Sequence, residues 1–345
     1  MTATDAIKDF PAGPEGSAGW PWEFTGADRG GDIAADSGPW PRITIVTPSY
    51  NQGRFLEATI RSVLLQGYPN LEYIVVDGGS TDDSVEVIRR YQPWIDYWVS
   101  EPDRGQAHAI NKGFERATGE IFAWLNSDDM YTPEALWRIG EAFRRGDCDV
   151  TSGHAVFVDE NGVPEGRYPA AAVDVRRLLS VRGGFTAPQQ GTFWSRQCWE
   201  RNGPLSEDLH YLMDYDFWIR MAAAGEKWIV LDRDLAFFRH HGSQKTAGLS
   251  SNLQMLGERR QVLERFRATG LCTRTFFRAV TRGLRENRVK EIRVTYANNA
   301  VKIPFWIYWL QAGLKNPICL SIPAFYGLLF RAGSVNYGPK TQNTD

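Results

Sequence analysis

The sequence predicts an α/β protein whose core is an open, mostly parallel β-sheet flanked by helices. Between residues 42 and 148, short runs of β-branched and aromatic residues alternate with amphipathic stretches of helical length. Strands that alternate with helices in this way are typical of βαβ units, in which neighbouring strands run parallel. The composition agrees, because 43% of the residues are hydrophobic and 23% are charged, as in globular domains. Such sheets bind ligands beyond the carboxyl ends of their strands.

Three regions of the 345-residue chain differ in composition. Residues 1–40 are rich in Gly, Pro, Ala and Asp without apolar periodicity, so we expect a flexible N-terminal arm. Residues 41–250 carry the strand and helix alternation and form the predicted main domain. Residues 251–345 contain 15 Lys and Arg against 5 Asp and Glu, a net charge of +10, and are expected to form a helical, basic and aromatic extension.

Four strands and four helices are predicted in order along the first part of the main domain. The strand segments are rich in buried-type residues, and the helical segments carry apolar residues at helical spacing. The second helix also begins with Ser80 and Asp83 at capping-box spacing. The predicted strands are 43–47, 71–79, 95–99 and 120–126, and the predicted helices are 55–64, 80–91, 106–117 and 133–145.

The rhythm changes beyond residue 148. A hairpin is predicted with one strand at 150–158 and a turn at 160–162. We expect this half of the domain to complete the sheet and to form the second wall of a cleft. Its other predicted elements are a strand at 191–195, a helix at 214–224 and a strand at 228–231.

Charge, cysteines and motifs exclude several classes of protein. The 39 Lys and Arg against 41 Asp and Glu leave a net charge of −2, so no nucleic-acid partner is expected. The four cysteines lie too far apart in the sequence for a zinc-site motif or an evident disulfide framework. The nucleophile elbow of serine hydrolases, the zinc-protease helix, the Walker A loop and the glycine-rich dinucleotide fingerprint do not occur.

The two ends of the sequence bear on location. The first 16 residues lack a basic region and an apolar region, so we expect no secretory signal and a cytoplasmic protein. Near the other end, the apolar stretches 303–310 and 317–330 are each too short to span a bilayer alone. Basic and aromatic side chains together suit an anionic membrane surface, so peripheral contact with the inner face of the cell membrane is expected. The alternative is a helical appendage with a solvated basic face.

Acidic residues follow two of the predicted strands. Asp77 ends the second strand before two glycines, so its carboxylate should emerge where a ligand can approach the backbone. The alternative is that Asp77 organises a turn before Ser80. Asp128 and Asp129 follow the fourth strand, and adjacent carboxylates are kept ionised most easily by a cation such as Mg²⁺ or Mn²⁺. The alternative there is an N-cap pair for the next helix.

Two further candidates lie in the second half. Asp214 and Asp216 stand near the start of a predicted helix in an apolar and aromatic segment, where a carboxylate can act as a general base. They can equally be ordinary acids of a helix N-terminus. His240 and His241 can serve as metal ligands or as acid–base groups, although such a pair is more often structural.

Five segments in one order carry a family resemblance. Taken together they resemble glycosyltransferase family 2, over about residues 42–246 of the chain. The resemblance implies a GT-A fold, a Rossmann-like, mixed and mostly parallel sheet flanked by helices. It also implies transfer of a sugar from a nucleoside-diphosphate sugar, commonly a UDP-sugar, to an acceptor hydroxyl with inversion at the anomeric carbon. The segments are residues 43–84, 101–129, 185–196, 213–221 and 237–244.

The resemblance also assigns ligand contacts. Asp77 would hydrogen-bond the nucleotide base, and Arg104 would reach the diphosphate. Gln189 and Gln190 would lie near the acceptor. The implied nucleotide-sugar contacts are Pro48, Tyr50, Asn51, Asp77, Arg104 and Asp128.

Metal ligands and a base follow from the same resemblance. The metal-binding DxD element corresponds to Ser-Asp-Asp, with Asp129 as the expected ligand of Mn²⁺ or Mg²⁺ and Asp128 near the ribose or the metal. His241 is a further implied ligand. The acidic pair that supplies the base reads Met-Asp here, so Asp214 is the expected base and Asp216 the alternative.

The implied partners are a nucleoside-diphosphate sugar and a glycan or lipid-linked acceptor, with a role in cell-surface polysaccharide or glycolipid assembly. Because Met213 replaces the first acid of the pair, a catalytically inactive nucleotide-sugar or glycan binding module is the alternative. A nucleotidyltransferase is disfavoured, because no glycine-rich activation loop followed by Lys or Arg occurs near the N-terminus.

Overall fold

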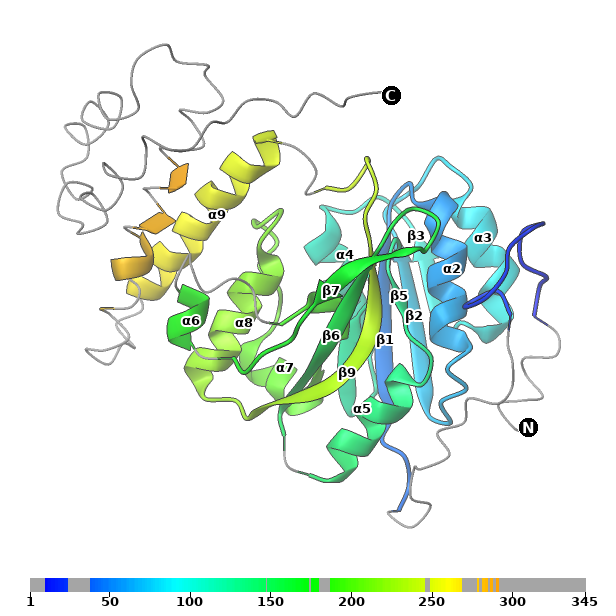
Figure 1. Cartoon of the computed structure of the whole chain (residues 1–345), viewed down its shortest axis with the longest axis horizontal. Coiled ribbons are helices and arrows are strands. Elements are labelled where there is room, and N and C mark those ends of the chain that lie inside the picture. The colour runs from blue at the N-terminus through cyan, green and yellow to red at the C-terminus, as the bar shows by residue number, and fades with distance from the viewer. Residues whose placement is uncertain are drawn as a thin grey trace, which may run out of the picture. The chain divides into compact units, whose positions relative to one another are not determined.

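The chain forms two compact units in its computed structural model (Figure 1). The first comprises residues 1–178 and 182–247, and the second comprises residues 179–181 and 248–345. No described helix is both long enough and apolar enough to cross a membrane. The structure describes residues 10–23, 38–146, 148–173, 175–179, 187–245, 249–268, 278, 281–284, 286–287 and 290–291.

A mixed sheet of nine described strands forms the centre of the first unit (Figure 1). Its order is β3-β2-β1-β4-β8-β6-β9-β5, with β7 paired to β6. The strands β1 to β4 run parallel, and β8 is antiparallel to both of its neighbours. This architecture confirms the predicted fold class. The strands are β1 (Ile43–Ser49), β2 (Leu71–Asp77), β3 (Tyr97–Ser100), β4 (Ile121–Trp124), β5 (Met130–Tyr131), β6 (Val150–Val158), β7 (Pro164–Tyr168), β8 (Thr192–Ser195) and β9 (Trp228–Arg239).

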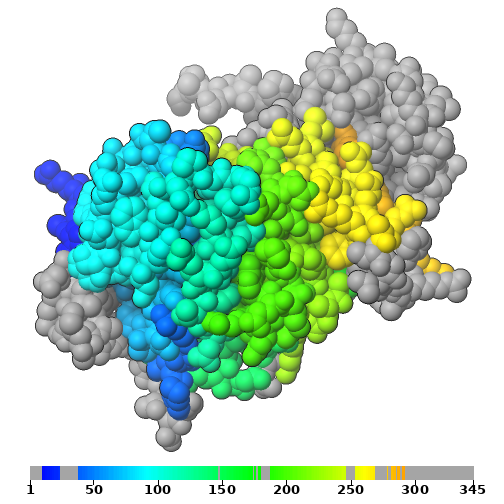
Figure 2. Space-filling model, turned by 180° about the vertical axis from the view of Figure 1, so that it is seen from behind, coloured from blue at the N-terminus to red at the C-terminus, as the bar shows by residue number. Residues whose placement is uncertain are grey.

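Helices cover both faces of the sheet. The helices α2, α3 and α5 share an apolar core with Ile43, Ile45 and Tyr73 on one face. On the other face, Phe114 of α4 contacts Trp199 of α7, and Figure 2 shows the cyan segment with α4 beside the green segment with α7. The helices of this unit are α2 (Gly53–Leu64), α3 (Ser84–Tyr91), η1 (Gln92–Trp94), α4 (Gln106–Arg116), α5 (Ala135–Arg144), α6 (Val175–Leu179), η2 (Gln189–Gly191), α7 (Arg196–Asn202) and α8 (Met213–Ala224).

Two strands show how the structure departs from the predicted elements. The predicted strand at 228–231 continues to Arg239 as β9, because after a shift in register Asp234 pairs with His154 and the strand stays beside β6. The two-residue strand β5 was not predicted, since it is too short to show a period. The strand β9 pairs with β5, and its last residue, Arg239, contacts the loop that follows β4.

Part of the predicted N-terminal arm contacts the domain. The buried Arg61 of α2 donates to the carbonyl oxygens of Pro11 at 2.7 Å, Pro21 at 3.0 Å and Trp22 at 3.2 Å. Trp20 Nε1 donates to the carbonyl of Tyr131 at 2.8 Å. Residues 10–23 are therefore attached to α2 and β5, while residues 1–9 and 24–37 lie outside the described part of the chain.

The second unit contains α9 (Leu249–Ala268), whose Leu256, Val262 and Leu263 are buried. Asn287 Nδ2 donates to the carbonyl of Leu256 at 2.8 Å and so ties a later segment to the helix. The predicted aromatic and apolar stretches at 303–310 and 317–330 lie outside the described residues.

Candidate active site

Polar side chains converge beyond the carboxyl end of β4. The loop that follows this strand carries Asp128 and Asp129, η2 carries two glutamines, and the end of β9 brings in an arginine and a histidine. The loop backbone is held by α2, since Thr59 Oγ1 lies 2.9 Å from the carbonyl oxygen of Ser127 and 2.7 Å from that of Asp129. We call the group the carboxyl-end cluster, and it comprises Asn126, Asp128, Asp129, Gln189, Gln190, Arg239 and His241.

Asp129 points into the protein. Its side chain is part of a residue that is only 1% exposed, and one carboxylate oxygen accepts from Gln190 Nε2 at 2.9 Å. The other oxygen accepts from the backbone N–H of Arg239 at 3.1 Å. Burial and the adjacent Asp128 carboxylate raise the pKa of Asp129 above its ordinary value. Both oxygens are occupied by protein donors, so the geometry favours a loop-holding role, and the metal role of Asp129 stays a prediction.

Asp128 faces His241 instead. The Asp128 Oδ2 and His241 Nε2 atoms are 3.0 Å apart, and the other imidazole nitrogen lies 2.8 Å from Ser243 Oγ. If Nδ1 donates its proton to Ser243, the Nε2 lone pair faces the carboxylate, and a cation between the two atoms stabilises this arrangement. Phe55 covers the imidazole with its ring centroid at 4.6 Å. The structure thus brings together two of the three predicted metal ligands.

The donor set of this pair fits a divalent ion. No group of three or more His, Cys, Asp or Glu side chains is gathered for metal binding among the described residues. Mg²⁺ and similar ions, however, commonly take one or two protein ligands and fill the other positions with phosphate oxygens and water. Neighbouring ligands of an octahedral ion, each about 2.1 Å from it, are themselves about 3 Å apart. The spacing of Asp128 and His241 satisfies this condition.

Arg239 is a cluster residue that sequence reasoning missed. It is 5% exposed, and its guanidinium donates to the carbonyl oxygens of Asp128 at 3.0 Å and Glu160 at 2.8 Å. Burial lowers its pKa, and the charges of Asp129 and Asp128 oppose that shift. Its place two residues before His241 in a strand that ends at the cluster is the signal that could have identified it.

The two predicted acceptor residues hold the cluster together. Gln189 Nε2 donates to the carbonyl of Trp124 at 2.8 Å, and its Oε1 accepts from Asn126 at 3.2 Å. Gln190 donates to Asp129, as described above. Both glutamines are buried. Contact with an acceptor therefore stays a prediction for them.

A chain of amides leads from the cluster to a lysine that sequence reasoning also missed. Gln106 at the start of α4 donates through Nε2 to Asn126 Oδ1 at 2.7 Å. Its Oε1 accepts from Lys245 Nζ at 3.1 Å, and this ammonium also lies 5.7 Å from the centre of the Tyr211 ring. The positively charged Lys245 thus lies next to the cluster, on the segment that follows β9.

Asp77 ends β2 with its carboxylate fully used by the protein. The residue is 0% exposed, and its oxygens accept from the backbone N–H groups of Gly79 at 3.1 Å and Ser80 at 2.9 Å. The hydroxyls of Ser80 and Ser100 also donate to it, at 2.5 and 2.7 Å. This is the turn-organising arrangement weighed as the alternative, and a contact with a nucleotide base stays a prediction.

The other predicted nucleotide contacts surround the ends of β1 and β2. Pro48 is buried in β1, whereas Tyr50 is 61% exposed. Asn51 has a positive φ of 51°, and its Oδ1 accepts from the backbone N–H of Thr81 at 2.8 Å. Asparagine tolerates this left-handed conformation better than most residues. The exposed Tyr50 ring is therefore presented by a loop that is fixed to the turn after β2.

Arg104 lies at the start of α4. Its guanidinium is 67% exposed and forms an ion pair of 2.7 Å with Glu207. Exposed pairs of this kind contribute little to stability, so the guanidinium can exchange partners at low cost. A diphosphate contact stays a prediction for this residue.

The two candidate bases, Asp216 and Asp214, differ in how deeply they are buried. Asp216 is buried in α8, where it accepts from Ser206 Oγ at 2.8 Å and from Arg220 Nε at 3.0 Å. Asp214 is half-buried in the first turn of the same helix, where its Oδ1 accepts from the backbone N–H of Tyr215 at 2.7 Å. Burial raises the pKa of Tyr168, and the charge of Asp214 adds to this shift. The role of general base stays a prediction for Asp214, with Asp216 as the alternative.

Comparison with known proteins gives relatives for most of the first unit. The profile described as "Glycosyl transferase family 2" matches residues 44–201. An uncharacterised glycosyltransferase of Mycobacterium tuberculosis (strain H37Rv) is 31% identical over 189 residues, which are 54% of this chain and 71% of that protein. The putative teichuronic acid biosynthesis glycosyltransferase TuaG of Bacillus subtilis is 33% identical over 132 residues, or 37% of this chain and 52% of TuaG.

Two solved structures share the architecture. TarS 1-349 of S. aureus in complex with UDP-GlcNAc has a TM-score of 0.57 at 16% identity, over 79% of each chain. The mannosyltransferase PcManGT from Pyrobaculum calidifontis, in complex with GDP-Man and Mn²⁺, has a TM-score of 0.54 at 19% identity, over 90% of this chain and 91% of its own. At these identities the likeness shows a common fold.

Proposed function

The chain belongs to glycosyltransferase family 2 and has the GT-A fold, and from this premise we propose that it is an inverting, metal-dependent glycosyltransferase. Its donor would be a nucleoside-diphosphate sugar, in the first instance a UDP-sugar, and its acceptor a hydroxyl group. The observation that carries the proposal is the pair of Asp128 and His241, 3.0 Å apart beyond the carboxyl end of β4. This edge is where open α/β sheets bind their ligands.

Asp128 and His241 would hold Mn²⁺ or Mg²⁺, in place of the Asp129 expected from the motif. When bound, such an ion neutralises negative charge on a departing diphosphate. Asp129, Gln190 and Arg239 fix the loop that presents Asp128, because each is hydrogen-bonded within the cluster. The complex of PcManGT with Mn²⁺ supports a divalent ion in this fold.

Asp214 would act as the general base that takes the proton of the acceptor hydroxyl. Inversion requires the acceptor oxygen to attack the anomeric carbon from the side opposite the diphosphate, so one base and one attack suffice. Asp216 is less suited, because Ser206 and Arg220 already satisfy its carboxylate.

The donor would bind beside β1 and β2. Tyr50 offers an exposed ring to a nucleotide base, and Arg104 and Lys245 offer positive charge to a diphosphate. TarS, with UDP-GlcNAc, supports a uridine nucleotide, whereas PcManGT, with GDP-Man, makes a guanosine nucleotide the alternative.

The acceptor would be a cell-surface glycan or a lipid-linked sugar. The similarity to TuaG supports polysaccharide assembly. Residues 251–345 carry a net charge of +10, which would favour contact with an anionic membrane from the cytoplasmic side. The alternative function, a binding module without turnover, is motivated by Met213 at the place of the first acid.

The test is thermal unfolding of the full chain with UDP-, GDP- and dTDP-sugars, each with and without Mn²⁺ or Mg²⁺. A ligand at 100 times its dissociation constant adds about 2.7 kcal/mol to the free energy of unfolding. We expect one nucleotide to stabilise the protein only with metal, and Asp128→Ala to remove this shift. A stabilised wild type that releases no nucleotide with any acceptor would favour the binding module, and a wild type that no nucleotide stabilises would contradict both functions.

A further inference from the structure

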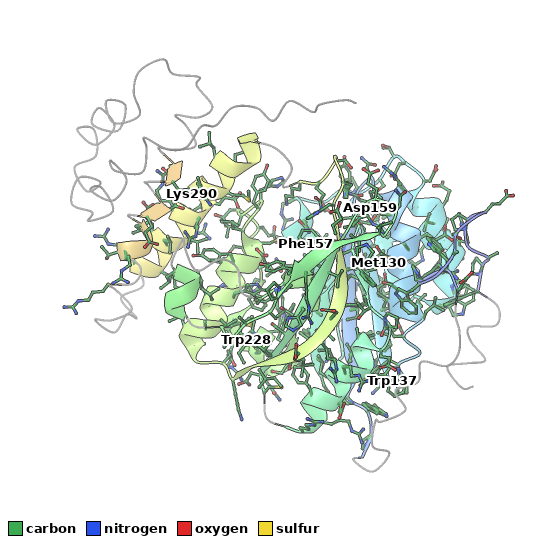
Figure 3. All side chains as sticks on the ribbon, viewed as in Figure 1. Met130, Trp137, Phe157, Asp159, Trp228 and Lys290 are labelled. Carbon is green, nitrogen blue, oxygen red and sulfur yellow. The ribbon has the colours of Figure 1, made fainter. Side chains whose placement is uncertain are left out.

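Four rings form a group on the strands next to the cluster. Phe157 of β6 lies between Tyr168 of β7, with ring centroids 5.8 Å apart, and His240 at the end of β9, at 4.6 Å. Phe238 of β9 completes the group at 5.5 Å from Phe157. All are partly exposed, and the His240 side chain is 44% exposed. We call these four rings the aromatic shelf, and Figure 3 labels Phe157 within it.

One part of the aromatic shelf is not covered by a side chain of β7, and we call this place the gap. The residue of β7 that pairs with Phe157 is Gly166, which has no side chain. A Cβ atom built at Gly166 would meet only Phe157 Cδ2, at 3.8 Å, and no other atom within 4 Å. The residues from Pro164 to Arg167 are all exposed. Any ordinary residue at position 166 would fill this space, so glycine leaves an edge of the Phe157 ring accessible.

Polar groups border the same surface. Glu165 Oε2 lies 3.0 Å from His240 Nδ1, and both side chains are about half exposed. Aromatic carbon together with carboxylate and imidazole edges matches a pyranose ring, which has apolar C–H faces and a rim of hydroxyl groups.

The aromatic shelf lies beside the metal pair of the candidate active site. At one end, His240 is the neighbour of His241, which meets Asp128. At the other end, Tyr168 lies within the electrostatic reach of Asp214. The predicted nucleotide contacts, in contrast, lie at the ends of β1 and β2, which are separated from β6 by β4 and β8 in the sheet.

We propose that the aromatic shelf and the gap over Gly166 bind a pyranose ring of the acceptor glycan. The inference deepens the proposed function and rests on it, because a sugar bound here would lie beside His240, the neighbour of the metal-pair residue His241. The donor is disfavoured as the occupant, because its nucleotide would bind beside the ends of β1 and β2, which β4 and β8 separate from β6 in the sheet.

The test compares three variants of the full chain with the wild type. Gly166→Val fills the gap, and it should not unfold the protein, because Gly166 has no left-handed backbone and valine favours strands. Phe157→Ala removes the central ring. Arg167→Val is the matched control, since its side chain is on the same strand but points to the other face. Each is examined by saturation-transfer NMR with the methyl β-pyranosides of glucose, galactose, mannose and N-acetylglucosamine, with and without UDP and Mg²⁺.

We expect the wild type and Arg167→Val to bind at least one pyranoside, and Gly166→Val and Phe157→Ala to bind it about tenfold more weakly. Wild-type affinity in Gly166→Val, or no pyranoside binding by the wild type, overturns the shelf. Binding of UDP, GDP and dTDP, followed with the same proteins, separates the two proposals. Sugar binding that depends on Gly166, in a protein that binds none of UDP, GDP and dTDP, would support the shelf and contradict the glycosyltransferase.

Discussion

Buried carboxylates occur at both ends of the parallel strands, and their pKa values are shifted in opposite directions at the two ends. At the amino end, Glu72 accepts from Thr44 Oγ1 at 2.5 Å, from Thr118 Oγ1 at 2.6 Å and from the backbone N–H of Thr118 at 2.7 Å. Its other partner is Arg42, at 3.2 Å. Burial alone would raise the pKa of Glu72, but these donors together hold it below its ordinary value. We call these four residues the amino-end network.

In the carboxyl-end cluster, the pKa of the buried carboxylate is raised instead of lowered. Asp129 is buried beside a second carboxylate, and these two causes keep its pKa raised although three groups donate to it. The guanidinium of Arg239 donates to carbonyl oxygens rather than to the carboxylates. The amino-end network therefore balances the charge of Glu72 with its own residues. In the cluster, burial and the neighbouring carboxylate disfavour the charged form of Asp129, and an added cation would reduce this cost. This difference separates a structural network from a candidate reaction site.

If chemistry is confined to the carboxyl end, the largest effect should come from Asp214→Ala. We expect turnover to fall by about 10² to 10⁴, the usual contribution of a general base, with donor binding retained. Steady-state kinetics with the identified donor measure the loss.

The control for this variant is Asp216→Ala. It leaves Arg220 without its buried partner and should lower the free energy of unfolding by about 3 kcal/mol, as seen in urea titrations. Near wild-type turnover in Asp214→Ala would remove it as the base.

The next effect concerns the metal. Asp128→Ala should weaken Mn²⁺ binding by roughly tenfold to hundredfold or more. Removal of a group that only hydrogen-bonds to a metal ligand typically costs this much, and Asp128 is proposed as a ligand itself. Calorimetric titration in the presence of UDP measures the affinity. Ser243→Ala, which removes only the partner of His241 Nδ1, should have a smaller effect. Unchanged Mn²⁺ affinity in Asp128→Ala would return the metal role to Asp129.

The amino-end network should affect stability without affecting chemistry. Glu72→Ala should lower the free energy of unfolding by about 2 kcal/mol at neutral pH, because buried donors lose their acceptor. The folded pKa of Glu72 is below its unfolded value, so its charge contributes fully above the unfolded pKa and this contribution is lost as the pH falls through the folded pKa. Urea titrations at descending pH should therefore show the wild type approaching the variant. A gap that stays constant in acid would contradict the charge argument.

The smallest effect should come from an exposed pair near the cluster. Arg54 pairs with Glu160, and both side chains are exposed. Arg54→Ala should change the free energy of unfolding by less than about 1 kcal/mol, because solvent screens such pairs. Thermal unfolding checks this. A larger loss would mean that the cluster depends on surface charge, which would weaken the contrast between the two ends.

The pattern of the sequence determined the framework of this comparison. Continuous apolar runs located β1 and β2, and stretches of helical length with apolar residues located α2 and α4, because burial imposes such patterns locally. The same reasoning placed Asp77 and the two adjacent aspartates after strands, where a parallel sheet gathers its loops. The motifs then identified the family that the comparisons show.

Only the tertiary structure decided what each of these residues does. Asp128 and Asp129 are neighbours that no periodic pattern distinguishes, yet one faces His241 and the other is closed in by Gln190 and the backbone of Arg239. The gap over Phe157 likewise depends on which residue of β7 pairs with it. These contacts join residues that lie far apart in the sequence, so they depend on how the whole sheet assembles, whereas strand and helix periods depend on neighbours only a few residues away.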